Sequence, residues 1–255
     1  MEKLSAVIIT LNEEKNLARC LPPLIRVADE IVVVDSFSTD GTMEVCRQFG
    51  VRVVQHAFED YVEQHRFADT QATYDLILSI DADEVLSEKL ISSINEVKKN
   101  RQFDGYFMNR MANYCGKWIY HSGWYPDRKL RLYDKSKGSW RGIIIHEYFQ
   151  LNPGAKSGFL KGNLLHYTYY SIEQHLLQVE KFSSLMAKSY FEQGVKMPAV
   201  RAWLSPVVRF IRCYFFELGF LDGSAGWRIC TISAKESYQK YQKLRMLHQQ
   251  DTSKR

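Results

Sequence analysis

Several widely used sequence signatures are missing from this 255-residue chain. Its five cysteines form no Cys-x-x-Cys pair and no spacing typical of a metal site, so we expect reduced thiols of a cytosolic protein. No run of eighteen apolar residues occurs, which argues against a membrane-spanning helix. The N-terminus (MEKLSAVIITLNEE) does not fit a signal peptide, because its apolar run at residues 6–11 is short and acids follow at once.

Two glycine-rich motifs are absent as well. The first apolar run is not followed by G-x-G-x-x-G, and G-x-x-x-x-G-K-S/T occurs nowhere, which disfavours a dinucleotide-binding site and a P-loop. The chain also has no internal repeat or low-complexity segment. Its apolar content of 45% is enough for a core, and its length fits one domain, or one domain with an appendage.

Charge is distributed unevenly along the chain. Residues 196–255 contain eleven Lys/Arg against four Asp/Glu, a net charge of +7, whereas the remainder carries a net charge of −2. A near-neutral body with a basic C-terminal segment predicts phosphate-rich or anionic partners.

Apolar, strand-like runs alternate with helix-like segments over the first eighty residues. The expected strands are residues 6–10, 31–35, 51–54 and 76–81, and the expected helices are residues 12–20, 39–49 and 61–72. We expect Asn12 to cap the first helix and Pro22-Pro23 to end it. The alternation predicts an α/β fold, with a mostly parallel sheet covered by helices on both faces.

The second half of the chain has a different texture. Glycines and aromatic residues are frequent between residues 105 and 147, where strands are expected, most clearly at residues 129–133 and 142–145. Everything after residue 170 is expected to be helical. We therefore predict an α/β domain over residues 1–170 and a helical C-terminal region over residues 171–255.

Three carboxylates follow the strand expected at residues 76–81. The run LILSIDADE ends in Asp81, Asp83 and Glu84, and packing gives no reason to gather acids there, since unpaired like charges cost free energy. Binding of a divalent cation gives such a reason, because Mg²⁺ or Mn²⁺ is commonly held by one or two carboxylates together with phosphate oxygens. The alternative is a solvated acidic turn that caps the next helix.

Polar residues also follow the first two strands. Thr10, Asn12 and Glu13 come at the end of the first, and Asp35 at the end of the second. Open α/β sheets bind ligands outside the carboxyl ends of their strands, and neighbouring helix N-termini favour anions. With the acidic cluster, these ends predict a nucleotide-diphosphate site with a metal. Taken singly, each could merely close a turn.

Three runs in this order, VIITLNEEKNL, VVVDSFSTDGT and LSIDADE, resemble the family 2 glycosyltransferases with the GT-A fold. The later runs GWYPDRKLRLYD, IIIHEYF and FLDGSAGW resemble a bacterial subgroup that adds glucose or a similar sugar to the lipopolysaccharide inner core. The resemblance implies a GT-A catalytic domain over residues 1–170, a nucleotide-sugar donor (UDP-glucose before others), a glycan or lipid-linked acceptor, and Mn²⁺ or Mg²⁺ as cofactor. No nucleic-acid partner is expected.

The resemblance also implies a nucleotide pocket and a metal site. The residues that would line the nucleotide pocket are Thr10, Asn12, Glu13, Asp35, Arg66 and Asp81. Asp83 would hold the metal with His166, while Glu84 would contact metal-bound water or the donor sugar. Arg66 could instead be a helix-surface arginine, and His166 could be a structural residue that ends an apolar strand.

Sugar transfer requires a base that accepts the proton of the acceptor hydroxyl. By the resemblance, Glu147 stands where relatives carry a catalytic acid, and His146 would orient it, bind the acceptor or act as the base itself. A single displacement with such a base predicts inversion at the sugar. The alternative for Glu147 is a surface acid at a strand end.

An aromatic and charged group at residues 124–131 is the predicted acceptor site. Trp124 could stack on a sugar face, with Asp127 beside it, and Arg131 could fork onto a phosphate. The alternative is a core tryptophan and a surface ion pair.

Residues 200–221 (VRAWLSPVVRFIRCYFFELGFL) are basic and rich in aromatic residues. Such an amphipathic segment suits an anionic membrane surface, so we expect a cytoplasmic protein peripheral on the inner face of the cell membrane. The alternative is that this face packs on the catalytic domain or forms a homodimer.

Three further functions stay open. A nucleotidyltransferase should have a glycine-rich loop after the first strand, and a non-catalytic scaffold should have lost the acids. A polyprenyl-phosphate sugar synthase would share the motifs but use a membrane lipid as acceptor. The sequence does not name the sugar, the acceptor or the metal.

Overall fold

The computed structural model describes residues 1–142, 147–196 and 199–252 of the chain. Two compact units are present, a sheet unit of Met1–Met111 with Asp127–His166 and a helical unit of Ala112–Pro126 with Tyr167–Arg255. The assignment of residues 1–170 to one functional domain stays a prediction, because compactness does not define a functional domain.

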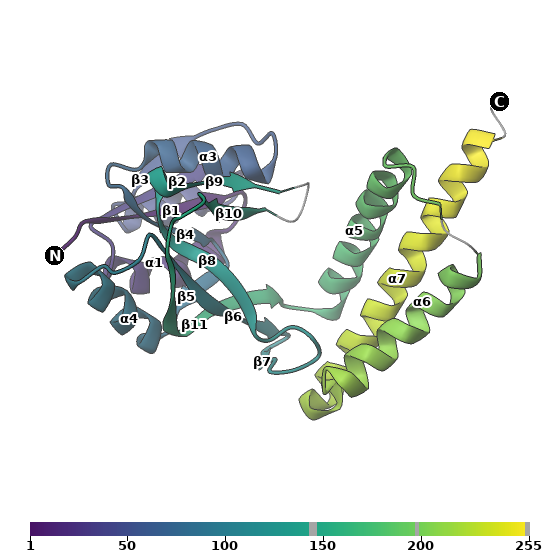
Figure 1. The fold of residues 1–255 in the computed structure, drawn as a ribbon. Coiled ribbons are helices and arrows are strands. Elements are labelled where there is room, and N and C mark those ends of the chain that lie inside the picture. Colours follow the sequence, from purple (N-terminus) through teal and green to yellow (C-terminus); the bar gives the residue numbers. More distant parts are fainter. Residues whose placement is uncertain (143–146, 197–198, 253–255) are drawn as a thin grey trace. The chain divides into compact units, whose positions relative to one another are not determined.

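Four parallel strands form one half of the nine-stranded sheet (Figure 1). They lie in the order β3-β2-β1-β4, and each begins within two residues of its predicted start. Nearly every residue of β1, β2 and β4 is buried, as expected of parallel strands covered on both faces. The bounds are Leu4–Thr10 (β1), Glu30–Asp35 (β2), Arg52–Gln55 (β3) and Leu76–Asp81 (β4).

The other half of the sheet is antiparallel. It continues from β4 in the order β8-β6-β11-β5, and β7 pairs with β6. The α/β class is therefore confirmed, whereas the sheet is mixed rather than mostly parallel. The neighbour of β4 on this side is β8, which runs antiparallel to it, and β5 pairs with β11 at the edge of the sheet. The bounds are Glu84–Leu86 (β5), Gly105–Tyr114 (β6), Lys117–Trp118 (β7), Asp127–Asp134 (β8) and Ser157–Tyr169 (β11).

A small two-stranded hairpin accompanies this sheet. It consists of β9 (Gly138–Arg141), which follows the short 3-10 helix η1 (Lys135–Lys137), and β10 (Tyr148–Leu151). The strand expected at residues 142–145 lies, apart from Gly142, outside the described residues.

Helices cover both faces of the sheet (Figure 1). One apolar core joins the sheet to α1 (Glu14–Ile25), α2 (Thr42–Gln48) and α4 (Glu88–Lys99). A second core on the opposite face joins it to α3 (Tyr61–Gln71) and the β9–β10 hairpin. This arrangement brings the ends of β1, β2 and β4 to one edge.

The start and end of α1 differ from expectation. Asn12 does not cap the helix, because its backbone is left-handed (φ 57°) and its side chain accepts a hydrogen bond from the Thr39 N–H at 2.8 Å. Pro22 and Pro23 lie inside the helix, which runs to Ile25. Complete burial of Leu21 and Leu24 explains why packing outweighs the two missing N–H donors.

In the helical unit, α5 (Ile172–Glu192) and α6 (Ala199–Ile211) pack on the long α7 (Gly223–Thr252) (Figure 1). Ser171 begins α5 with a capping box formed with Gln174. Pro206 lies within α6, and a π-helical turn η2 (Arg212–Phe216) and a 3-10 turn η3 (Gly219–Asp222) lead into α7. None of the helices in the described ranges is long and apolar enough to cross a bilayer.

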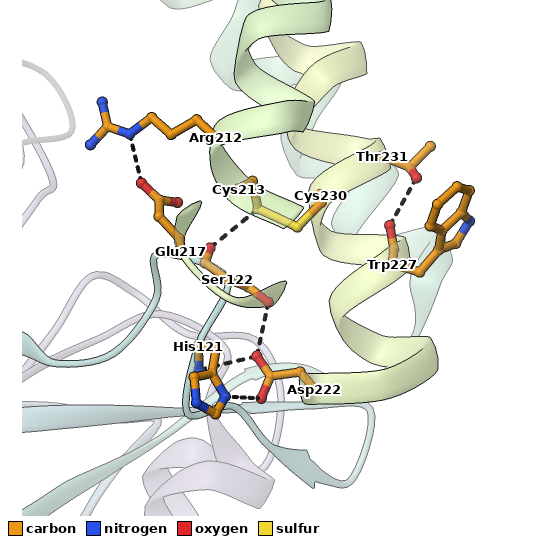
Figure 2. The surroundings of a disulfide bond; sticks show 9 residues. All are labelled: His121, Ser122, Arg212, Cys213, Glu217, Asp222, Trp227, Cys230 and Thr231. Carbon is orange, nitrogen blue, oxygen red and sulfur yellow. Dashed lines mark hydrogen bonds and ion pairs between the residues drawn. A yellow bond between two sulfur atoms is a disulfide. The ribbon is translucent and has the colours of Figure 1, made fainter. Parts of the chain in front are cut away.

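Two cysteines of the helical unit are joined, which corrects the expectation of five reduced thiols. Cys213 of η2 and Cys230 of α7 form a disulfide (Figure 2). Gly219 lies against this pair, since a Cβ there would come within 2.7 Å of Cys230 Sγ. Sequence spacing of 17 residues could not reveal the proximity, because it arises from the turn through η2 and η3. Cys20, Cys46 and Cys115 are free.

Next to the disulfide, Asp222 holds a loop of the same unit (Figure 2). Its buried carboxylate accepts hydrogen bonds from the backbone N–H of Tyr120 and His121 and from the Ser122 hydroxyl. The FLDGSAGW run singled out in the sequence therefore contains the residue that fixes residues 120–122.

Candidate active site

The three acids that follow β4 occupy different environments. The Glu84 side chain is completely buried, whereas Asp83 keeps 28% of its side-chain surface exposed. Arg131, itself buried on β8, donates to both Asp81 and Glu84. The backbone N–H of Asp81 also donates to Glu84 at 3.0 Å, which closes the turn between β4 and β5.

Their protonation differs accordingly. Burial by itself would raise the pKa of Asp81, but the attraction of Arg131 and then of His65 lowers it to about 2. Burial raises the pKa of Glu84 despite the same arginine. Glu84 thus belongs to the packing beneath the site, whereas the side chains of Asp81 and Asp83 keep 26% and 28% of their surface exposed.

Asp83 meets His166 of β11. The ring Nε2 of His166 lies 3.0 Å from Asp83 Oδ2, and His166 faces Glu84 in the pairing of β11 with β5. Over the described part of the chain, no group of three or more His, Cys, Asp or Glu side chains could hold a metal ion. A carboxylate and an imidazole at one point fit a divalent cation whose remaining ligands are phosphate oxygens and water.

The ends of β1 and β2 lie side by side, with Thr10 paired to Asp35 in register. Asp35 is completely buried and accepts hydrogen bonds from the backbone N–H and hydroxyl of Ser38. Ser38 in turn accepts from the Asn12 N–H at 2.8 Å, which links the two loops. The Thr10 hydroxyl is buried with no hydrogen-bond partner within the described residues.

Glu13 connects these loops to the acidic cluster. Its N–H donates to Thr42, and burial raises the pKa of its carboxyl, with the nearby charges of Asp83, Asp40 and Asp81 adding to the effect. Glu13 therefore shares one electrostatic field with Asp83 and Asp81.

Arg66 faces another element. It forms an ion pair with Glu63 and donates from Nη2 to the Trp140 carbonyl at 2.9 Å, so it ties α3 to β9. Its side chain remains 47% exposed. Both the nucleotide-side role and the helix-surface alternative therefore stay predictions.

Sequence reasoning overlooked two buried residues of α3. His65 stacks on Trp140, with ring centroids 3.9 Å apart, and its Nε2 lies 4.0 Å from Asp81. Burial lowers the pKa of His65 to about 4, so the ring is neutral near pH 7. Asp69, one helical turn on, accepts from Tyr133 and from the Trp140 indole at 3.0 Å, and burial raises its pKa to about 7. The available signal was two ionisable residues spaced i, i+4 on one face of a helix.

Glu147 immediately precedes β10, and its charge acts on Arg131 and Tyr61. Burial lowers the pKa of Arg131, but Asp81, Glu84 and Glu147 outweigh this and raise it. Burial, followed by the charge of Glu147, raises the pKa of Tyr61. Glu147 therefore lies close enough to the acidic cluster to share its field. His146 lies outside the described residues.

The predicted acceptor residues have other partners. Asp127 pairs with Arg110 at 2.8 Å and with Lys129 at 3.4 Å in the sheet unit. Trp124 belongs to the helical unit, where it packs edge-on against Tyr114. Arg131 is held by carboxylates rather than facing solvent. Their acceptor roles stay predictions.

Comparison with known proteins agrees with this geometry. A family model described as glycosyl transferase family 2 matches residues 5–156, which include β1 to β10 and the acids at their ends. The chain belongs to the family 2 glycosyltransferases.

Relatives of this glycosyltransferase match it along nearly its whole length. An uncharacterized glycosyltransferase of Rickettsia typhi is 30% identical over 97% of this chain and 88% of its own. The lipopolysaccharide core biosynthesis glycosyltransferase LpsC of Rhizobium meliloti is 29% identical over 93% of both chains. A mannosyltransferase structure from Pyrobaculum calidifontis, in complex with GDP-mannose and Mn²⁺, covers 95% of this chain and 86% of its own, with TM-score 0.55 and 13% identity. The GT-A fold of the glycosyltransferase is thereby confirmed.

Proposed function

We propose that this glycosyltransferase moves a sugar from a UDP-sugar, with UDP-glucose as the first candidate, to a hydroxyl of a lipopolysaccharide core or another cell-envelope glycan. The observation that carries the proposal is the meeting of Asp83 and His166 beside the polar ends of β1 and β2. Asp35, buried and fixed by Ser38, would receive the base or ribose, and the Thr10 hydroxyl has an unused hydrogen-bonding position.

Asp83 and His166 are the residues that would hold a divalent cation, Mn²⁺ or Mg²⁺. Bound there, such an ion neutralises the charge that develops on a leaving diphosphate. Arg110 and Arg131, the arginines that contact Glu84, are both committed to carboxylates. The mannosyltransferase of the same fold was solved with GDP-mannose and Mn²⁺, which supports the pairing of nucleotide sugar and metal.

Glu147 is proposed as the general base, with His146 to orient it or bind the acceptor. The support is that its charge acts on Arg131, which in turn holds Asp81 and Glu84. A base that removes the acceptor proton during a single displacement inverts the anomeric centre. An α-linked donor would thus give a β-linked product.

The acceptor and the location complete the proposal. LpsC is a lipopolysaccharide core biosynthesis glycosyltransferase, and this relative supports a core sugar as acceptor. Such acceptors are lipid-linked, so we place the enzyme in the cytoplasm, peripheral on the inner face of the cell membrane. A homodimer is the alternative use of the helical unit.

Thermal stabilisation by nucleotides with Mn²⁺ and with a chelator tests the donor site. At about a hundredfold its Kd, a ligand specific for the folded state stabilises by roughly 2.7 kcal/mol, so UDP with Mn²⁺ should raise the melting temperature. The effect should vanish in Asp83→Asn and survive in Asp75→Asn, a matched change at an exposed acid of the same unit. No response to any nucleotide would contradict the proposal. Product in the lipid phase without core oligosaccharide would select a polyprenyl-phosphate sugar synthase instead.

A further inference from the structure

Helix α6 exposes its apolar residues. Val200, Trp203, Leu204, Val207, Val208 and Ile211 recur at the i, i+3, i+4 spacing of one helix face. Each has between 42% and 70% of its surface exposed. Phe215 (56%) and Phe216 (79%) extend the series into η2. We refer to these eight residues as the α6 face.

Internal contacts hold the other side of α6 in place. Ala202 is completely buried, the Ser205 hydroxyl lies 2.7 Å from the Ser237 hydroxyl of α7, and Phe210 packs edge-on against Trp227. Below them the disulfide between Cys213 and Cys230 joins η2 to α7 (Figure 2). The α6 face is therefore presented by a helix whose rotation is fixed within its own unit.

An apolar face of this size needs an occupant, since soluble proteins seldom expose large contiguous apolar patches. The charge of the segment that carries the α6 face indicates which occupant fits. Residues 193–216 contain four basic residues, Lys196, Arg201, Arg209 and Arg212, and no acid, and of these Arg212 pairs with Glu217 at 2.8 Å. A second copy of the chain would bring the same positive charge against this segment, whereas an anionic lipid surface is complementary to it. A tryptophan among aliphatic residues also suits the boundary between headgroups and acyl chains.

We infer that the α6 face inserts into the interfacial layer of an anionic lipid bilayer, with the basic residues of this segment contacting the headgroups. The helix would lie in the plane of the membrane. The inference rests on the proposed function only in that a lipid-linked acceptor gives the enzyme a reason to be at a membrane. It names the eight side chains that would contact the lipid. It gives α6 a role distinct from that of α5, whose buried positions pack in the helical unit.

Cosedimentation of the full chain with vesicles tests the inference. Wild type should bind vesicles of phosphatidylglycerol and phosphatidylethanolamine, and binding should weaken as salt rises. The triple change Trp203→Ser, Leu204→Ser, Val208→Ser should lower the partition coefficient by at least about tenfold. Leu177→Ser is the matched control, because Leu177 is an apolar residue of α5 with 72% exposure. It should leave binding unchanged.

Three results would overturn the inference. They are equal vesicle binding by the triple variant and wild type, no vesicle binding by wild type at low salt, and a wild-type dimer that the triple variant converts to monomer without lipid. Circular dichroism and the nucleotide-induced melting shift show whether the variant is folded. Loss of vesicle binding with an intact nucleotide response separates this inference from the proposed donor site. A missing nucleotide response with intact vesicle binding would refute only the proposed function.

Discussion

Replacing Arg131 by alanine should destabilise the protein strongly. Arg131 is 5% exposed and donates to Asp81 and to Glu84, and the Glu84 side chain has no exposed surface. The change removes the cation that pairs the buried Glu84 carboxylate and the partly exposed Asp81 carboxylate. Breaking a buried ion pair by removing one partner costs about 3–5 kcal/mol, because a charge is left without compensation. For a chain of this size each kcal/mol lowers the melting temperature by roughly 2–4 °C, so a fall of about 6–20 °C is expected.

The stability difference between wild type and Arg131→Ala should also depend on pH. In wild type the pKa of Asp81 is lowered to about 2, so its stabilising contribution is present above the unfolded pKa and is lost as pH falls towards 2. In the variant, the folded-state pKa values of Asp81 and Glu84 should rise, and protonation then removes the penalty at low pH. The difference in stability between the two proteins should therefore shrink as pH falls from 8 to 4.

Differential scanning fluorimetry at several pH values, with chemical denaturation at pH 8, measures both effects. Arg128→Ala is the control, since Arg128 lies on the same strand but is exposed. A melting temperature of Arg131→Ala within about 2 °C of wild type, or a gap that widens at low pH, would refute the reasoning.

Three more predictions follow from the site and the helical unit. Burial raises the pKa of Asp69 to about 7, so the folded state keeps a proton that the unfolded chain loses near pH 4, and stability should fall by up to about 4 kcal/mol as pH rises through this window. Melting curves of Asp69→Asn should lack that slope, and a slope shared with wild type would exclude Asp69 as its source. Glu147→Gln should lower kcat by about 10²–10⁴-fold with the UDP-induced melting shift intact, whereas Glu59→Gln, at an exposed acid, should match wild type in a sugar-transfer assay. Cys213→Ser with Cys230→Ser should cost about 3 kcal/mol, the contribution typical of a loop near 17 residues, and dithiothreitol should reproduce the loss in wild type but add nothing to the variant.

The parallel half of the sheet was predictable because its signal is local. Each of the strands β1, β2 and β4 is a short apolar run followed by polar residues, and burial on both faces is what such a run requires. The same logic placed Asp35 and Thr10 at one edge. It failed for Pro22 and Pro23, since the sequence shows the missing donors but not the buried leucines that hold the helix together.

Features that depend on contacts between residues far apart in the sequence could not be predicted from the sequence. The importance of His65 and Asp69 comes from Trp140, more than seventy residues away, which stacks on one and donates to the other. Periodicity showed that α6 is amphipathic, but its burial pattern was needed to show that the apolar side is exposed. The pairing of Cys213 with Cys230 likewise depends on the path of η2 and η3.

The run Asp81-Ala82-Asp83-Glu84 shows why an acidic cluster at a strand end has to be divided by environment before roles are assigned. Its sequence presents three equivalent carboxylates, yet Arg131 pairs with two of them, Asp81 and Glu84, and Glu84 also accepts the Asp81 N–H, which fixes the turn. With both neighbours held, Asp83 is kept at the surface opposite His166. The two carboxylates paired with Arg131 thus contribute rigidity at the position where a metal-linked diphosphate would need a ligand held in place. Weakening the contacts of Arg131 with Asp81 and Glu84 should therefore displace Asp83 even though Asp83 itself is unchanged.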